Sequence, residues 1–211
     1  MWLGTYYRHL LLKKLNFDLE GEKALEIGCH DGFIISNIKA RTKVGIDLKP
    51  INKYPNVDYI KSDFIDYNFD KRKFDIILSI EVMEHIEDAD KFLWKLSNLI
   101  SKKGKALLSV PSKNIKVFPS IFQSYIDKRW GHYYRRGFGV DELKSLLKRN
   151  IKGKKFKIIE WNCPFYRSFY IPLKFLWPIL PFITKKILSL LIDLDLKFKK
   201  GKSGFFFVVV Y

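Results

Sequence analysis

The chain has 211 residues, of which 47% are hydrophobic, and its formal net charge is +17 at pH 7. This length gives one domain with a full core, so we expect a single domain over residues 1–211. Only two cysteines occur, Cys29 and Cys163, which excludes a disulfide-stapled scaffold and fits a reducing cytoplasm. The first residues also lack the basic start and cleavage site of a secretory signal peptide.

Lysine supplies most of the positive charge. Such a field favours anionic partners, namely nucleic acid, acidic lipid surfaces or phosphorylated substrates. The alternative is a solvated, lysine-rich surface without a dedicated partner. Arginine, the better reader of phosphates and base edges, is sparse, which makes nucleic acid a less favoured partner.

The first predicted elements are a helix over residues 5–15, followed by a short apolar strand, Ala24–Ile27. Residues 28–32 (GCHDG) form a tight turn, and Phe33 opens a second helix. Backbone N–H groups at the start of such a helix face whatever binds at the turn. The next strand ends at Asp47, a carboxylate placed to accept hydrogen bonds from ribose hydroxyls. This arrangement predicts a nucleoside-containing cofactor.

The turn does not suit a dinucleotide. A dinucleotide site uses G-x-G-x-x-G, with its middle glycine against the pyrophosphate, whereas His30 and Asp31 crowd this turn. Glu26 would also repel a pyrophosphate. A carboxylate at that position suits a cationic or zwitterionic ligand instead.

Further strands and helices alternate along the chain. Apolar spacing predicts a helix through residues 92–100 that ends at Gly104, and another through residues 141–147. The remaining strands are expected at residues 57–61, 74–80, 104–111, 156–161 and 205–211. The alternation predicts an α/β fold with a doubly wound, mostly parallel sheet and helices on both faces.

Glu26–Gly32 (EIGCHDG) resembles motif I of the Rossmann-like, class I S-adenosylmethionine (SAM) methyltransferases, and it departs from that motif at His30. Four later landmarks occur in the family's order. They are Ser62-Asp63-Phe64, the F-D-x-I start at Phe74, E-V-x-E-H-x-x-D at residues 81–88, and the strand that ends at Pro111.

The resemblance implies a seven-stranded sheet whose last strand is antiparallel, with SAM as the cofactor. In the family, the residue matching Asp63 bonds the adenine amine and the next residue covers the ring. The expected cofactor-binding residues are Glu26, Gly28, Cys29, Gly32, Asp47, Asp63, Phe64 and Ile80.

Methyl transfer from SAM depends mainly on orientation, and a hydroxyl acceptor benefits from a base or a metal. The candidate catalytic residues are His85 and His132. His132 belongs to segment 112–139, which follows the fifth strand and is expected to cover the substrate. It would act either as a base or only in closing the pocket.

Glu81, Glu84 and His85 are similar to the E-x-x-E-H of ubiquinone-pathway O-methyltransferases and of small-RNA 3′-terminal 2′-O-methyltransferases. In those families the three side chains hold a divalent metal, which would lower the pKa of an acceptor hydroxyl. The alternative, which we favour, is that these residues pack and cap without metal.

Residues 162–204 form an aromatic and lysine-rich insertion before the last strand. Its longest charge-free run, residues 175–184, is far shorter than the roughly twenty apolar residues that a spanning helix needs. Two interpretations stay open. The insertion is either a lid or oligomer contact, or a segment that lies on an anionic membrane surface.

We therefore expect a SAM-dependent methyltransferase that modifies a small molecule on oxygen, with a lipid- or glycan-linked acceptor included. The expected location is the cytoplasm, with peripheral attachment to the inner membrane surface as one option. An RNA 2′-O-methyltransferase ranks second. A SAM-binding partner protein without catalysis ranks third.

Overall fold

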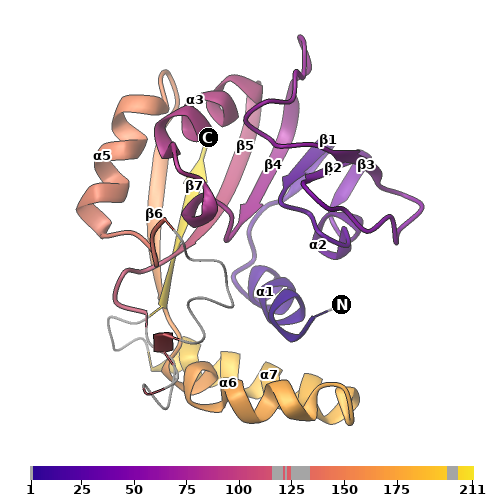
Figure 1. Ribbon diagram of the computed structural model, residues 1–211, viewed down its shortest axis with the longest axis vertical. Coiled ribbons are helices and arrows are strands. Elements are labelled where there is room, and N and C mark those ends of the chain that lie inside the picture. The colour runs from indigo at the N-terminus through magenta and orange to yellow at the C-terminus, as the bar shows by residue number, and fades with distance from the viewer. Residues whose placement is uncertain (1, 116–120, 122, 125–133, 199–203) are drawn as a thin grey trace.

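The computed structural model describes residues 2–115, 121, 123–124, 134–198 and 204–211. Its centre is a seven-stranded sheet with the strand order β3-β2-β1-β4-β5-β7-β6 (Figure 1). β7 runs antiparallel to both of its neighbours, and the other paired strands are parallel, which confirms the predicted fold. The strands are β1 (Glu20–Ile27), β2 (Lys39–Asp47), β3 (Asp58–Lys61), β4 (Phe74–Ile80), β5 (Ile100–Pro111), β6 (Phe156–Asn162) and β7 (Gly204–Val210).

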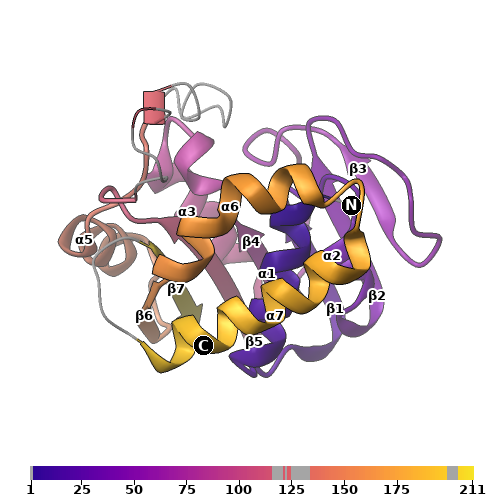
Figure 2. The same cartoon turned by 90° about the horizontal axis from the view of Figure 1, so that it is seen from below.

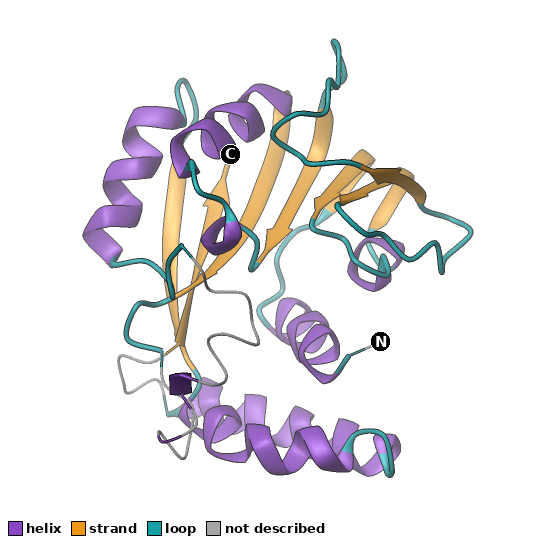
Figure 3. Ribbon diagram, viewed as in Figure 1, coloured by secondary structure: helices purple, strands orange, loops and turns teal. Residues whose placement is uncertain are grey.

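Helices lie on both sides of this sheet (Figure 3). α3 (Ala89–Leu99) and α5 (Val140–Asn150) pack on one face. The other face is covered by α1 (Leu3–Lys14), the short α2 (Phe33–Ser36), α6 (Pro164–Leu176) and α7 (Pro181–Lys197). Each face buries its own apolar cluster, so the sheet is the shared wall between two halves of the core.

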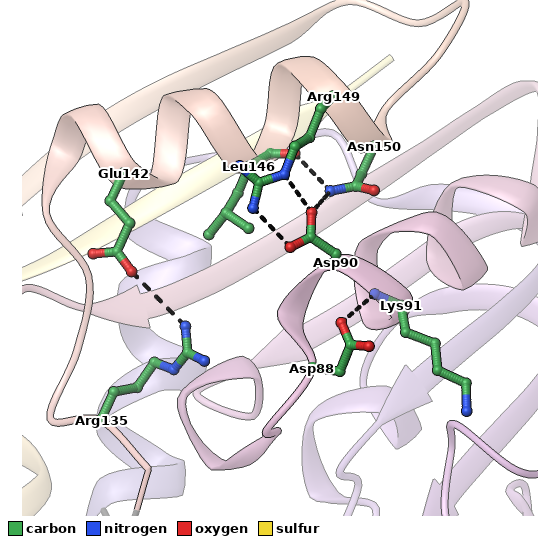
Figure 4. A network of polar contacts seen from close by, with 8 residues as sticks. All are labelled: Asp88, Asp90, Lys91, Arg135, Glu142, Leu146, Arg149 and Asn150. Carbon is green, nitrogen blue, oxygen red and sulfur yellow. Dashed lines mark hydrogen bonds and ion pairs between the residues drawn. The ribbon is translucent and has the colours of Figure 1, made fainter.

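On the first face, α3 presents Phe92, Leu93 and Leu96 to the strands, and all three are fully buried. A polar network at the surface ties α3 to α5 (Figure 4). Asp90 accepts hydrogen bonds from Arg149, one of them with an N–O distance of 2.7 Å, and from Asn150. These hydrogen bonds, Arg149 first, lower the pKa of Asp90 to about 2. Because the Asp90–Arg149 ion pair is largely exposed, it adds little to the free energy of unfolding.

On the second face, α1 lies between the sheet and the α6–α7 pair (Figures 1 and 2). The ring of Tyr7 on α1 stacks on the ring of Tyr166 on α6, with centroids 3.6 Å apart. The Tyr7 hydroxyl also accepts a hydrogen bond from Trp161 Nε1 at 3.0 Å. This buried contact joins the amino-terminal helix to the insertion and to β6.

Two predicted elements differ from the structure. The predicted helix through residues 92–100 ends at Leu99, and Gly104 lies inside β5 rather than at a helix end. The pairing of β4 with β5 shifts register between Phe74 and Ile76, and a Cβ on Gly104 would lie 2.6 Å from the Phe74 carbonyl oxygen. Gly104 is therefore required by an irregular strand pairing, not by a helix stop. The helix that Phe33 opens has only four residues, Phe33–Ser36.

The insertion between β6 and β7 folds into the helical hairpin α6–α7. Pro164 and Pro181 stand at the starts of the two helices, where a proline loses no helical hydrogen bond. Asp195 of α7 is fully buried and accepts hydrogen bonds from the N–H groups of Phe165, at 2.9 Å, and Tyr166, at 3.2 Å. These are orphan donors of the first turn of α6, so one helix caps the other.

We predict that Asp195→Ala lowers the free energy of unfolding by about 2 kcal/mol, because two N–H groups at the α6 start lose their acceptor. Asp195→Asn keeps one acceptor oxygen and should lose less. Urea denaturation of both variants measures the difference. An Ala variant as stable as the parent would contradict the capping role.

Candidate active site

The turn after β1 is shaped by glycines in the left-handed region. Gly28 has φ +73° and Gly32 has φ +74°. A Cβ on Gly28 would lie 2.4 Å from Val82 Cγ2, and a Cβ on Gly32 would lie 2.3 Å from the Tyr59 hydroxyl oxygen. No larger residue fits at either position without displacing a neighbour, so the turn lies tightly against β3 and against the segment that follows β4.

His30 stands where motif I normally has glycine, and it adopts φ +47°. The backbone of the motif is thus kept, at the strain that a non-glycine residue carries in this region. The ring of His30 lies edge-on to Trp2, with centroids 6.2 Å apart. The side chain that departs from the motif therefore faces the start of α1.

Asp47 ends β2 beside this turn and is half-buried. One carboxylate oxygen accepts a hydrogen bond from the N–H of His30 at 2.9 Å, and the other accepts from the N–H of Lys49 at 2.9 Å. Each carboxylate oxygen can accept a second hydrogen bond. The carboxylate is thus held in place with one acceptor position left on each oxygen, which fits a pair of ribose hydroxyls.

Glu26, at 3% exposure, is held differently. Its Oε2 accepts a hydrogen bond from the N–H of Ile35 at 3.0 Å, so the side chain fastens the single turn of α2 to β1. Burial raises the pKa of Glu26 to about 8, against that hydrogen bond and with the nearby charges of Asp31 and Asp47. Glu26 is thus a carboxyl group whose ionisation costs free energy in this site unless a cation is near.

The other residues of the predicted cofactor set lie at the same edge of the sheet with varied exposure. Asp63 is half-buried and accepts a hydrogen bond from the N–H of Ile65 at 2.7 Å. Phe64 packs in the core, with its ring centroid 5.2 Å from that of Phe92, so any contact with a cofactor would come from its backbone. Cys29 and Ile80 are buried as well, and burial raises the pKa of the Cys29 thiol.

A cavity of about 220 Å³ opens at the carboxyl ends of β4 and β5, between α1 and α6. Charged and aromatic side chains line it from four segments that are far apart in the sequence. They include Tyr7, Arg8, Glu81, Glu84, His85, Tyr166, Arg167 and Tyr170. Ligands bind outside the carboxyl ends of strands in sheets of this kind, so the cavity lies where an acceptor is expected.

The three residues of the E-x-x-E-H segment lie in this cavity without forming a metal centre. Glu81 forms an ion pair with Arg8 of α1. Glu84 is buried, and its Oε1 lies 3.9 Å from His85 Nε2. Burial, with the charge of Glu81, holds the pKa of Glu84 well above its usual range. Within the described part of the chain, no three His, Cys, Asp or Glu side chains are grouped to hold a metal ion.

The sequence alone did not single out Arg8, Tyr166, Arg167 and Tyr170. Each reaches the cavity only because α1 and α6 pack together over the ends of the strands. One signal was available: arginine is scarce in this lysine-rich chain, yet Arg8 and Arg167 each sit in an aromatic segment. The catalytic candidate His132 lies outside the described residues, as does most of segment 112–139.

The comparisons with known proteins agree on one family. Residues 2–150 match the family model described as a methyltransferase domain. The chain is 31% identical over 166 residues to the ubiquinone biosynthesis O-methyltransferase of Pelagibacter ubique (strain HTCC1062), covering 67% of this chain and 68% of that protein. It is 30% identical over 148 residues to the enzyme of the same name from Bartonella quintana (strain Toulouse), covering 62% and 60%.

Solved structures share the fold at low sequence identity. The phosphoethanolamine N-methyltransferase 2 of Haemonchus contortus, in complex with SAM, aligns with a TM-score of 0.63 and 16% identity over 99% of this chain. This chain spans about half of that protein, 52%. A putative SAM-dependent methyltransferase from Listeria monocytogenes aligns with a TM-score of 0.61 and 14% identity over 98% of each chain.

We predict a pH-dependent effect of Glu26→Gln on stability in the absence of ligand. Because the folded pKa of Glu26 is raised from 4.5 to about 8, the parent loses stability as pH rises through that window, while the amide of the variant does not titrate. The free energy of unfolding of the variant, minus that of the parent, should therefore rise by about 1.4 kcal/mol per pH unit across this window. Urea denaturation at pH 5 and pH 8 tests this; a constant difference between the two proteins would refute it.

Proposed function

We propose an oxygen atom of a small molecule as the methyl acceptor of this chain, which belongs to the class I SAM-dependent methyltransferase family. The observation that carries the proposal is the polar cavity at the ends of β4 and β5. Its lining offers the imidazole of His85, which can accept a hydroxyl proton, and carboxyl groups that can hydrogen-bond an acceptor. The O-methyltransferase names of the curated relatives support the same acceptor atom.

For the cofactor we propose the set predicted from the sequence. Asp47 would bind the ribose hydroxyls with the acceptor position left on each oxygen. The tight approach at Gly28 and Gly32 favours backbone contacts to the methionine portion. The carboxyl group of Glu26 suits SAM, because SAM is zwitterionic and carries positive charge. The full proposed set is Glu26, Gly28, Cys29, Gly32, Asp47, Asp63, Phe64 through its backbone, and Ile80.

When bound, SAM supplies a methyl group already activated by its sulfonium. Transfer to a hydroxyl would break the carbon–sulfur bond and form an oxygen–carbon bond, so the acceptor hydroxyl would have to lose its proton. We propose that His85, whose side chain lines the cavity, accepts this proton. His132, which lies outside the described residues, is the alternative acceptor. The remaining task of the protein is to orient the hydroxyl.

A metal does not fit this arrangement. The Glu81 carboxylate already forms an ion pair with Arg8. Within the described residues, no three His, Cys, Asp or Glu side chains are grouped to hold a metal ion. The proposed transfer therefore uses no metal, and the E-x-x-E-H segment serves ion pairing and acceptor contact.

The acceptor class can be narrowed further. An exposed apolar hairpin next to the cavity favours a lipid- or glycan-linked acceptor met at an anionic membrane surface. An exposed apolar surface is a poor contact for nucleic acid, so RNA 2′-O-methylation remains the second candidate function. A SAM-binding role without catalysis would leave the polar lining of the cavity without a purpose.

Within the described residues, no helix has the length and hydrophobicity to cross a membrane.

We predict that Asp47→Ala weakens SAM binding by about 1–3 kcal/mol, or roughly 5-fold to 150-fold, because charge-assisted hydrogen bonds are lost. Asp47→Asn keeps an acceptor oxygen, so its affinity should lie between those of the parent and the Ala variant. Isothermal calorimetry measures both, with NAD as the control ligand. Saturable NAD binding without SAM binding would contradict the cofactor assignment.

We predict that methyl transfer survives excess chelator and falls at least tenfold in His85→Ala, with SAM affinity unchanged. Full activity in His85→Ala would instead assign the proton to His132. The assay uses carbon-13-labelled SAM with a bacterial lipid extract, a polar metabolite extract and total RNA as separate acceptor pools. Magnetic resonance of the product identifies the methylated atom. Loss of activity in chelator, or transfer to the RNA pool alone, would overturn the respective assignment.

A further inference from the structure

We propose that the turn of the α6–α7 hairpin docks the protein on an anionic lipid bilayer. We call residues 175–183 the hairpin tip. This inference deepens the proposed function, because it names the surface from which the acceptor is taken. It is measured without cofactor or acceptor, so it stands or fails apart from the catalytic proposal.

The hairpin tip ends in a run of exposed apolar side chains. Residues 179–183 (ILPFI) are all exposed, and none of them is polar. Phe175 is 71% exposed, Ile179 73% and Phe182 77%. Contiguous exposed apolar surface of this kind marks an interaction site on a globular protein.

The charges around the tip select an anionic partner. Lys174, Lys185 and Lys186 flank it, and Lys186 is exposed. The hairpin helices contain two carboxylates, and neither is free to repel an anionic surface. Asp193 forms an ion pair with Lys14, and Asp195 is buried as the cap of α6. Aromatic and aliphatic groups edged by lysine are the features of a segment that lies in the membrane interface.

A second copy of the chain fits the tip less well. A symmetric dimer formed tip to tip would place the same lysines of both chains against each other. A bilayer instead offers hydrocarbon to the apolar residues and phosphates to the lysines at once. We therefore commit to the bilayer and treat a dimer as an outcome of the test.

The geometry also connects the docking surface to the cavity. α6 turns Tyr166, Arg167 and Tyr170 toward the cavity, while Phe169 and Phe175 of the same helix are exposed. Figure 2, which views the molecule from the hairpin side, shows α6 and α7 lying in front of α1. Docking of the tip would therefore bring a wall of the acceptor cavity to the membrane surface.

The first experiment is co-sedimentation of the full chain with vesicles of phosphatidylglycerol and phosphatidylcholine, compared with phosphatidylcholine alone. Binding should require the anionic lipid and weaken as salt is raised. F175S/I179S/F182S should lower the partition coefficient at least tenfold. The matched control is W94S/Y211S, which alters exposed aromatic side chains that lie away from the hairpin; it should bind like the parent.

Charge is tested separately. K174Q/K186Q should lower partitioning at least tenfold, since each lysine near an anionic leaflet contributes about fivefold. K102Q/K103Q removes the same charge from two exposed lysines in β5 and should have a much smaller effect. Equal losses in the two pairs would mean that net charge alone drives binding, which would overturn the docking surface.

A second measurement covers the case in which a variant folds poorly. Cys29 and Cys163 are both buried, so a single introduced cysteine can be labelled selectively. An environment-sensitive dye at F182C should shift to the blue on anionic vesicles, and the same dye at W94C should not. Failure of the parent chain to sediment, no shift at F182C, or a concentration-dependent dimer abolished by the triple serine variant would each reject the proposal.

Discussion

The antiparallel entry of β7 between β5 and β6 decides where the functional surface forms. Gly204 opens β7 opposite Asn162, the last residue of β6, so both strands meet at the edge where β1 and β4 also end. A Cβ on Gly204 would lie 1.8 Å from the Trp161 carbonyl oxygen, and the Gly204 carbonyl accepts a hydrogen bond from the N–H of Ser112. Anything inserted between β6 and β7 is therefore held over the ligand edge of the sheet.

The cavity and the exposed hairpin follow from that constraint. α6 starts directly after β6 and meets α1 through the Tyr7–Tyr166 stack, which closes a cavity over the ends of β4 and β5. The ion pair between Arg8 and Glu81 then bridges α1 to the segment after β4. One inserted hairpin thus supplies both a wall of the cavity and the apolar surface that faces away from it.

The parts of the fold that depend on local sequence were predictable. The glycine turn at Gly28, the strand end at Asp47 and the strand–helix alternation follow from spacing and residue type, and the structure has them in the expected places. The prediction that Gly104 ends a helix was wrong. A glycine after an apolar helix resembles a helix stop, whereas here its missing side chain avoids a clash with a neighbouring strand. That clash is a tertiary contact and has no local signature.

The same limit applies to the site. Phe64 follows a strand as the family pattern requires, but its surroundings place the ring in the core. No local pattern indicated that Arg8 would meet Glu81, since the two residues are 73 positions apart. Contacts between distant helices, rather than motifs, built the acceptor side of this site.

A crystal structure of the full chain with S-adenosylhomocysteine tests the central claim most directly. The account predicts the ribose at Asp47 and the sulfur atom facing the cavity between α1 and α6, within reach of a hydroxyl beside His85. A ligand whose sulfur points away from this cavity, or one bound in the groove beside His9 instead, would contradict it.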